Sequence, residues 1–254
     1  MTAPPVAPMI SCRDVHKRFA TKASTTFVAL GGVTLDIAAG EFITVLGPSG
    51  CGKSTLLNMI AGFDSPTSGD LLVDGAAVTG PSPDKGVVFQ EFALFPWLSV
   101  RRNIAYGLRE RKVGKAEQRR IVDGMLELVG LQQVADHYPH QLSGGMKQRV
   151  SLARVLAIEP KILLLDEPFG ALDEQRRMQL QDDLLRIWEQ QRKTAVFVTH
   201  SIEEAVVLGD RVVVMAAQPG RIRTVIDIDL PRPRDRTSDE FNALRRTVTD
   251  ALWS

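Results

Sequence analysis

Residues 47–54 have the sequence Gly47-Pro48-Ser49-Gly50-Cys51-Gly52-Lys53-Ser54, which matches the phosphate-binding pattern G-x-x-x-x-G-K-[ST]. A short apolar run at 42–46 precedes this stretch, and from Lys53 to Gly62 the apolar residues recur at helical spacing. The order predicts a strand, a glycine-rich loop and a helix. Backbone N–H groups of such a loop, continuing to Thr55, would bind phosphates at the helix N-terminus. A turn that only caps a helix would explain the glycines, but not Lys53 and Ser54.

The two polar residues that end the loop have separate predicted roles. The Lys53 ammonium would contact the β- and γ-phosphates, and the Ser54 hydroxyl would bind Mg²⁺. The stretch therefore predicts binding of a nucleoside triphosphate together with Mg²⁺.

A second glycine-rich turn lies far along the chain, at Ser143-Gly144-Gly145. Helical spacing follows it from Gly145 to Ala157, so these residues would open a helix. Ser143 fits an ordinary helix N-cap, and a capped helix N-terminus is also suited to an anion such as a γ-phosphate. One phosphate loop does not account for this second turn.

Composition narrows the class of protein. The chain has 254 residues, is 44% hydrophobic and carries 31 basic against 30 acidic residues. We expect one domain, with two lobes at most, and no global field favouring nucleic acid or an anionic membrane. Cys12 and Cys51 are expected to be free thiols in a reducing compartment. Neither a signal peptide nor a membrane span is predicted, and the residues from Pro231 onward are expected to form a charged surface tail.

The remaining pattern indicates an α/β fold. Short apolar runs without polar alternation are typical of strands buried in a parallel sheet, and they occur at 87–89, 162–165, 195–198 and 211–215. Val33, Leu35 and Ile37 alternate with polar residues, which predicts a smaller antiparallel element. Residues from about 99 to 160 show helical spacing and predict an inserted helical lobe.

Functional residues follow several of these runs. Ligands of open α/β sheets bind at the carboxyl ends of the strands, so we expect convergence on one site of Gly47, Gln90, Asp166 and His200. Asp166 and Glu167 end an apolar strand, where two carboxylates need a cation or hydrogen-bond donors. Asp166 would hold Mg²⁺ and Glu167 would polarise the attacking water. A plain polar strand end before Pro168 is the competing interpretation.

Together these motifs resemble the ATP-binding-cassette (ABC) family. Leu142-Ser143-Gly144-Gly145 is similar to its signature, Gln90 to its Q-loop, Gly170-Ala171-Leu172-Asp173 to its D-loop and His200 to its switch histidine, in the family's order. The resemblance covers roughly residues 9–228 and implies ATP and Mg²⁺ as cofactors. It implies a P-loop NTPase (RecA-like) core at about 9–98 and 161–228, with a mostly parallel sheet and an N-terminal antiparallel β subdomain. The α-helical subdomain would lie at about 99–160 and the tail at about 229–254.

The resemblance also implies an assembly and residue roles. Two subunits form a head-to-tail homodimer, in which Ser143, Gly144, Gly145 and Asp173 of one face the phosphate loop of the other. Gln90 is implied as a Mg²⁺ and water ligand, and His200 as a γ-phosphate contact, although an ordinary strand-end histidine remains open. Phe19 matches the family's position for the aromatic residue that stacks on the nucleotide base. Phe27 is the alternative, and a role in the core remains possible for either ring.

The segment Gln90–Val100 is apolar, aromatic and broken by Pro96. Part of it is expected to be core, and the rest would form a groove for a partner's short helix, with Trp97 as the anchor. In the family, transporters receive membrane permeases at this place. Residues 86–90, 94–97, 103–104 and 165–173 look most like ATPases of nitrate, sulfonate and taurine importers.

That resemblance implies a peripheral subunit at the cytoplasmic face of the inner membrane, with the permease and a periplasmic or lipid-anchored binding protein as separate chains. Two other classes are disfavoured. A DNA-repair cassette would carry a long coiled coil between Gln90 and Ser143, and a translation factor would repeat both motifs. No nucleic-acid partner is expected.

Overall fold

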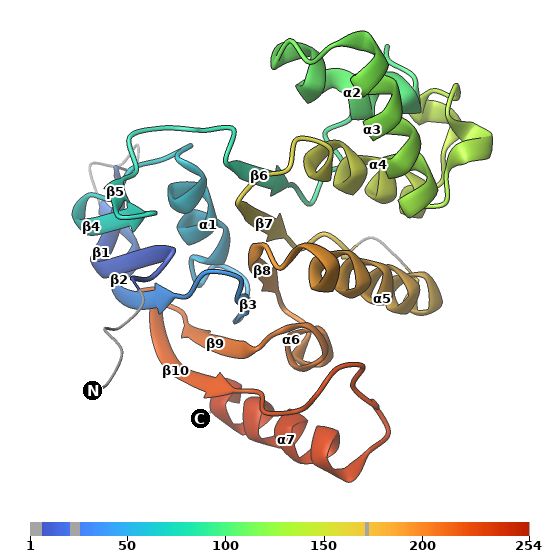
Figure 1. The fold of residues 1–254 in the computed structure, drawn as a ribbon. Coiled ribbons are helices and arrows are strands. Elements are labelled where there is room, and N and C mark those ends of the chain that lie inside the picture. The colour runs from blue at the N-terminus through green and yellow to red at the C-terminus, as the bar shows by residue number, and fades with distance from the viewer. Residues whose placement is uncertain (1–6, 21–25, 171–172, 254) are drawn as a thin grey trace, which may run out of the picture. The chain divides into compact units, whose positions relative to one another are not determined.

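A computed structural model describes residues 7–20, 26–170 and 173–253. The predicted D-loop residues Ala171 and Leu172 lie outside these ranges. The chain divides into two compact units, one comprising Met1–Ser82 with Arg192–Ser254 and the other Pro83–Gln191. Figure 1 shows the elements of each unit, which are described in turn below.

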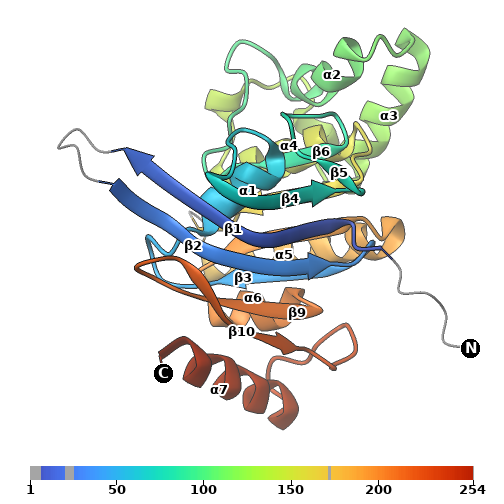
Figure 2. The same cartoon turned by 90° about the vertical axis from the view of Figure 1, so that its left-hand side faces the viewer.

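The first unit contains an antiparallel sheet in the order β2-β1-β4-β5. Its strands are β1 (Ile10–Ala20), β2 (Thr26–Ile37), β4 (Ser68–Val73) and β5 (Ala76–Ala77), and Figure 2 shows the long β1–β2 hairpin. Val33, Leu35 and Ile37 are buried while the intervening residues are exposed, as the alternation predicted.

The same unit contains the strand that leads into the phosphate loop. β3 (Phe42–Leu46) is buried throughout and pairs in parallel with both β8 (Thr194–Thr199) and β9 (Arg211–Ala216). β10 (Arg221–Asp227) pairs antiparallel with β9. The helices of this unit are α1 (Lys53–Ala61), α6 (Ile202–Leu208) and α7 (Asp239–Trp253). The apolar runs at 42–46, 195–198 and 211–215 therefore form buried parallel strands, as predicted, whereas the run at 87–89 belongs to the half-buried β6 (Lys85–Val88) and its Phe89 is exposed.

Helix α7 replaces much of the charged tail expected from the sequence. It packs against α6 and β9, and its Phe241 and Val248 side chains are fully buried. The chain before it is held by Arg234, which donates hydrogen bonds to the carbonyls of Val206, Val207 and Gly209 at the end of α6. These carbonyls have no partner within the helix, so the guanidinium satisfies them. Burial among these carbonyls lowers the pKa of Arg234 to about 10.

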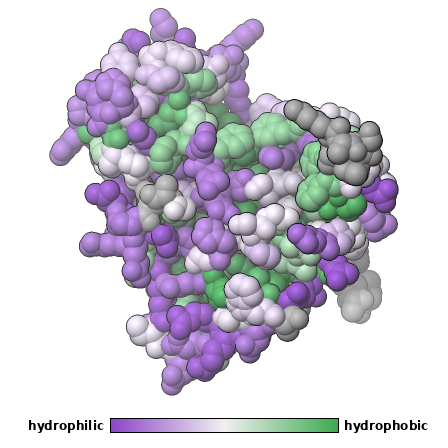
Figure 3. Space-filling model, turned by 180° about the vertical axis from the view of Figure 1, so that it is seen from behind, coloured by the Kyte–Doolittle hydropathy of each residue, from purple (hydrophilic) through white to green (hydrophobic). Residues whose placement is uncertain are grey.

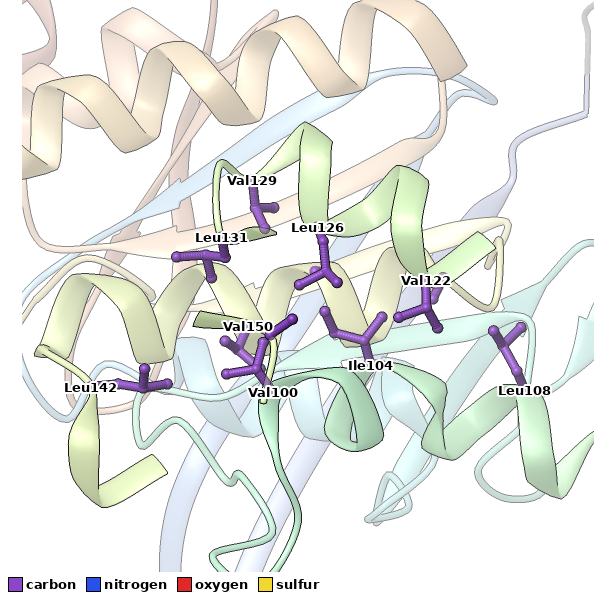
Figure 4. Packing of buried hydrophobic residues seen from close by; sticks show 12 residues of the cluster. Val100, Ile104, Leu108, Val122, Leu126, Val129, Leu131, Leu142 and Val150 are labelled. Carbon is purple, nitrogen blue, oxygen red and sulfur yellow. The ribbon is translucent and has the colours of Figure 1, made fainter. Parts of the chain in front are cut away.

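The second unit is mainly helical. β6 (Lys85–Val88) pairs in parallel with β7 (Ile162–Asp166). Between them lie α2 (Val100–Glu110), α3 (Lys115–Leu128), two short 3₁₀ helices (Gln132–Val134 and Pro139–Gln141) and α4 (Gly144–Leu156), and α5 (Glu174–Gln191) follows. Figure 4 shows the apolar cluster between α2, α3 and α4, with Ile104, Leu126 and Val150 at its centre. Residues 99–160 contain helices and no strand, as predicted.

Among the described residues, no helix is both long and apolar enough to cross a membrane. Figure 3 shows one face of the molecule, on which hydrophilic residues are interspersed with smaller apolar areas.

Candidate nucleotide site

The phosphate loop of the first unit ends at a helix whose N-terminus is open. Gly52 is the N-cap of α1 at φ 93°, and no described side chain caps the helix. A Cβ on Gly52 would lie 2.5 Å from Leu30 Cδ2 and 2.9 Å from the Ala29 carbonyl oxygen. Only glycine fits this left-handed position against β2. The first N–H groups of α1 are therefore available to an anion.

Lys53 lies inside the loop that it is predicted to serve. Its side chain is buried, and Nζ donates hydrogen bonds to the carbonyl oxygens of Gly47 at 2.8 Å and Pro48 at 3.1 Å. Buried ammonium groups need such partners. Ser54 is exposed and Thr55 half-buried on the first turn of α1. The loop thus holds the Lys53 ammonium in place, and the hydroxyl of the next residue, Ser54, is accessible.

The loop is backed by the turn between β9 and β10. A Cβ on Gly220 would lie 2.2 Å from the Cys51 carbonyl oxygen, and one on Gly47 would lie 2.6 Å from Cys51 Sγ. Gly220 N–H donates to the Ala29 carbonyl at 3.1 Å. Cys51 is buried and, like Cys12, forms no disulfide with another described residue. This close backbone packing fixes the path of the loop.

His200 follows β8 at the edge from which the loop emerges. Leu46 and Thr199 are register partners in the parallel pair β3–β8, so Gly47 and His200 both come directly after them. The Thr199 hydroxyl donates to the buried Glu204, and Ser201 N–H donates to that hydroxyl at 2.9 Å. These bonds fix the backbone around an exposed imidazole. The first unit therefore brings together the phosphate loop and the candidate switch histidine.

Phe19 and Phe27 are register partners across β1 and β2. Directly opposite residues of an antiparallel pair share a face, so the two rings lie beside each other. Phe19 is 39% exposed and Phe27 is 50% exposed, and Lys17 Nζ lies 4.9 Å from the centre of the Phe19 ring. A core role is excluded for both, and the geometry leaves either ring able to stack on a base.

The second unit assembles the carboxylates and the glutamine. Val88 of β6 and Leu165 of β7 are register partners, so Gln90 and Glu167 both follow two residues later at the same edge. Gly170 N–H donates to the Glu167 carbonyl at 3.2 Å, and a Cβ on Gly170 would lie 4.0 Å from Gln90 Nε2. Asp166 and Glu167 are half-buried.

Glu167 has a strained backbone. Its φ of 43° lies in the left-handed region that residues other than glycine adopt rarely. Such strain concentrates at functional sites, where it directs a side chain that the surrounding structure holds in place.

The second glycine-rich turn opens a helix beside a basic pocket. Ser143 is the N-cap of α4 and its Oγ accepts a hydrogen bond from Met146 N–H at 3.3 Å. A cavity of about 220 Å³ adjoins it, lined by Ser143, Gly145, Met146, Arg149, Arg176 and Leu180. Sequence reasoning missed Arg149 and Arg176. Arg149 is only six residues after Ser143, and the helical spacing predicted for that stretch could have placed it near the turn.

Asp173 is linked to this pocket through Arg176. It caps the start of α5 by accepting from Arg176 N–H at 3.0 Å, and its other carboxylate oxygen pairs with Arg176 Nε at 3.3 Å. Arg149 pairs in the same way with Asp183 at 3.5 Å, so the two residues missed by the sequence analysis bring guanidinium groups to the Ser143 turn with a carboxylate beside each.

Comparison with known proteins decides the family. The model of the ABC transporter family matches residues 30–170. An uncharacterized ABC transporter ATP-binding protein of Methanocaldococcus jannaschii is 53% identical over 88% of this chain and 84% of its own length. The chain belongs to the ABC transporter family. It is an ABC-type ATPase and the ATP-binding subunit of a transporter.

Other relatives and solved structures agree with this ABC assignment. The nitrate import ATP-binding protein NrtC and the bicarbonate transport ATP-binding protein CmpC, both of Synechococcus elongatus, are each 50% identical. NrtC matches 87% of this chain over 34% of its own length, and CmpC matches 89% over 35%. A dimeric ATP-binding cassette in a post-hydrolysis state, bound to ADP and Pi, has a TM-score of 0.78 at 33% identity, covering 88% of this chain and all of that one. The predicted P-loop fold is confirmed.

Proposed function

We propose that this ABC ATPase energises an importer as a head-to-tail homodimer with two composite ATP sites. The observation that carries the proposal is the Ser143-capped N-terminus of α4, which opens on a pocket containing two arginines. This helix N-terminus is a second feature suited to an anion, in a different unit from the phosphate loop. In a head-to-tail dimer, each Ser143–Gly145 turn serves the γ-phosphate bound by the partner's loop. The dimeric cassette of the solved structures supports this arrangement.

Within each proposed site, the N–H groups of 47–55 and Lys53 bind the phosphates of ATP. Ser54, Gln90 and Asp166 would hold Mg²⁺. A hydroxyl, an amide carbonyl and a carboxylate fit the preference of Mg²⁺ for oxygen ligands. When bound, Mg²⁺ neutralises the charge that develops on the transferred phosphoryl group. One aromatic residue of the Phe19–Phe27 pair stacks on the adenine.

Hydrolysis in this proposal is directed by Glu167. Its carboxylate accepts a hydrogen bond from the attacking water and takes up the proton as the oxygen bonds to the γ-phosphorus. The bond from the γ-phosphorus to the bridging oxygen breaks, leaving ADP and inorganic phosphate. The imidazole N–H of His200 donates a hydrogen bond to the γ-phosphate and holds it in line. Asp173, next to Arg176, lies at the dimer contact beside the Ser143 turn.

The permease contact is proposed to be the aromatic surface formed by Phe95, Trp97 and Tyr106. Phe95 lies 4.4 Å from Tyr106 and 5.7 Å from Trp97 between ring centres, and Trp97 is 69% exposed. Aromatic side chains with large exposed areas are typical anchors of protein interfaces. The surface continues from Gln90, so a change at the γ-phosphate can reach the permease through one short segment.

One side chain connects this surface to the helix that Ser143 opens. Arg154 of α4 donates to the Ala93 carbonyl at 2.8 Å and lies 5.4 Å from the centre of the Phe95 ring. Burial lowers the pKa of Arg154. The signature helix and the proposed permease contact would therefore move together.

The solute is proposed to be nitrate, sulfonate, taurine or a related small molecule. The relatives named for nitrate import and bicarbonate transport support a small anion. The subunit would lie at the cytoplasmic face of the inner membrane, with a separate permease and a periplasmic or lipid-anchored binding protein. A DNA-repair or translation role is disfavoured, because the phosphate loop and the signature each occur once and the segment between Gln90 and Ser143 forms short helices in place of a long coiled coil.

Purification from detergent-solubilised membranes tests this proposal. A tagged chain should carry with it a protein with several hydrophobic spans, identified by mass spectrometry, and the Trp97→Ala variant should lose it. Recovery of ribosomal or DNA-bound proteins in its place would contradict the importer role.

A further inference from the structure

Helices α2 and α3 line an open, strongly basic cavity that the proposed function does not use. Its volume is about 450 Å³, and five of the residues that line it are cationic: Arg101, Arg102, Arg109, Lys115 and Arg119. No carboxylate lines it. Its size lies within the usual range of small-molecule sites, roughly 300–1,000 Å³.

The positive charge of this basic cavity is largely uncompensated. Arg101 pairs with Asp123, but within the described part of the chain Arg102, Arg109, Lys115 and Arg119 make no ion pair. The nearby Glu117 is engaged by Arg120, which does not line the cavity. Like charges held in one concave site repel one another, and a bound anion would remove that repulsion.

The cations are concentrated on facing sides of the two helices rather than spread around them. Arg101, Ala105 and Arg109 recur every four residues along one side of α2, and Lys115, Arg119 and Val122 follow one side of α3. Val122 belongs to the apolar cluster of Figure 4 and Ala105 packs against it, so the floor of the basic cavity is fixed. A merely solvated charged surface would not need this alignment.

Lys115 provides a second indication of an anion. It is the first residue of α3, whose N-cap Gly114 provides no side-chain cap. A cation at a helix N-terminus is unfavourable, because the dipole and the free N–H groups there favour negative charge. Arg109 in the last turn of α2 is explained by that helix's dipole, but Lys115 is not. Glu117 places a carboxylate in the first turn of α3, but Arg120 engages it, so an anion between Lys115 and the α3 N–H groups would complement both.

We propose that the basic cavity binds a multivalent phosphate anion, either a soluble polyphosphate or a phospholipid headgroup. Guanidinium groups bind phosphate oxygens through paired hydrogen bonds, and four of the five cations are arginines. The volume accommodates a small anion rather than a folded peptide. The site is separate from the phosphate loop, which lies in the other unit.

Calorimetry with pyrophosphate tests the proposal in the full chain carrying Lys53→Ala, which weakens binding at the phosphate loop. Adding Arg109→Ala and Arg119→Ala removes two exposed cavity cations. Adding Arg245→Ala and Arg246→Ala instead removes the same charge from exposed positions on α7, outside the cavity. We expect the cavity pair to weaken pyrophosphate binding about tenfold or more and the control pair less than about twofold. Equal weakening by both pairs would overturn the proposal.

Flotation with vesicles separates the two sources of phosphate. Vesicles of phosphatidylcholine alone are compared with vesicles that also contain phosphatidic acid. Binding to the second kind that only the cavity pair removes supports a headgroup, while loss of pyrophosphate binding with unchanged flotation supports a soluble anion. If neither phosphate probe depends on the cavity pair, or if only a poly-glutamate peptide does, the phosphate assignment is wrong.

Discussion

Replacing Asn103 with Ala should loosen the proposed permease contact while leaving the phosphate loop intact. Asn103 is fully buried on α2, and its side chain holds the segment before the helix. Oδ1 accepts from Phe95 N–H at 2.9 Å, and Nδ2 donates to the carbonyls of Phe95, Leu98 and Ser99 at 3.2, 2.9 and 3.1 Å. Because each such bond contributes about 0.5–1.5 kcal/mol, we expect the free energy of unfolding to fall by about 2–4 kcal/mol.

Urea denaturation followed by tryptophan fluorescence measures this loss, and permease co-purification measures its functional result. The matched control is Asn242→Ala on α7, whose amide donates to only two carbonyls, those of Thr237 at 3.3 Å and Ser238 at 2.9 Å. We expect a loss of about 1 kcal/mol or less in this control. Nucleotide affinity should stay near that of the original chain in both variants. If Asn103→Ala is as stable as the control and still retains the permease, the hydrogen bonds of Asn103 do not hold the permease-contact segment in place.

Three further predictions follow from individual side chains. Glu167→Gln should keep ATP affinity but lower turnover about 100-fold or more, because the amide keeps the shape and loses the base; wild-type turnover in a phosphate-release assay would remove Glu167 from the mechanism. Trp97→Ala should weaken permease assembly with nucleotide affinity unchanged, and the opposite pattern, measured by co-purification and nucleotide titration, would refute the anchor role. Burial and the negative charge of Asp36 raise the pKa of Cys12 to about 12, so the folded state favours the neutral thiol. The contribution of the buried Cys12 thiol to the free energy of unfolding is therefore fully present below the pKa of an unfolded cysteine and is lost as the pH rises toward 12. In the folded chain, Cys12 should resist alkylation by iodoacetamide at pH 8, and it should react once the chain is unfolded.

The features predicted well from the sequence are those fixed by neighbouring residues. The run at 42–46, the glycines after it and the helical spacing from Lys53 are local patterns, and β3, the loop and α1 follow them directly. The cross-strand pairing of Phe19 with Phe27 depends on the register of β1 and β2, which shifts three times along the pair. No local pattern determines such shifts.

The missed features depend on contacts distant in sequence or on a pattern that was overlooked. Arg176 of α5 lines the pocket at Ser143, and it lies there only because α5 packs beside α4, which no local sequence pattern predicts. In contrast, α7 was predictable, because Phe241, Leu244, Val248 and Leu252 recur at helical spacing. The charged residues at 231–236 favoured the prediction of a surface tail, but Arg234 hydrogen-bonds to carbonyls at the end of α6 and holds this segment against the first unit.

The measurement that tests the composite-site model most directly is nucleotide trapping in a mixed dimer. A Lys53→Ala subunit is combined with a Ser143→Arg subunit, each with its own tag, and dimers carrying both tags are purified. If Ser143 acts across the interface, both lesions fall in one site and the other site is intact. We predict one vanadate-trapped nucleotide per mixed dimer and none in either mutant homodimer. Equal failure of verified mixed dimers and both homodimers would contradict the composite site.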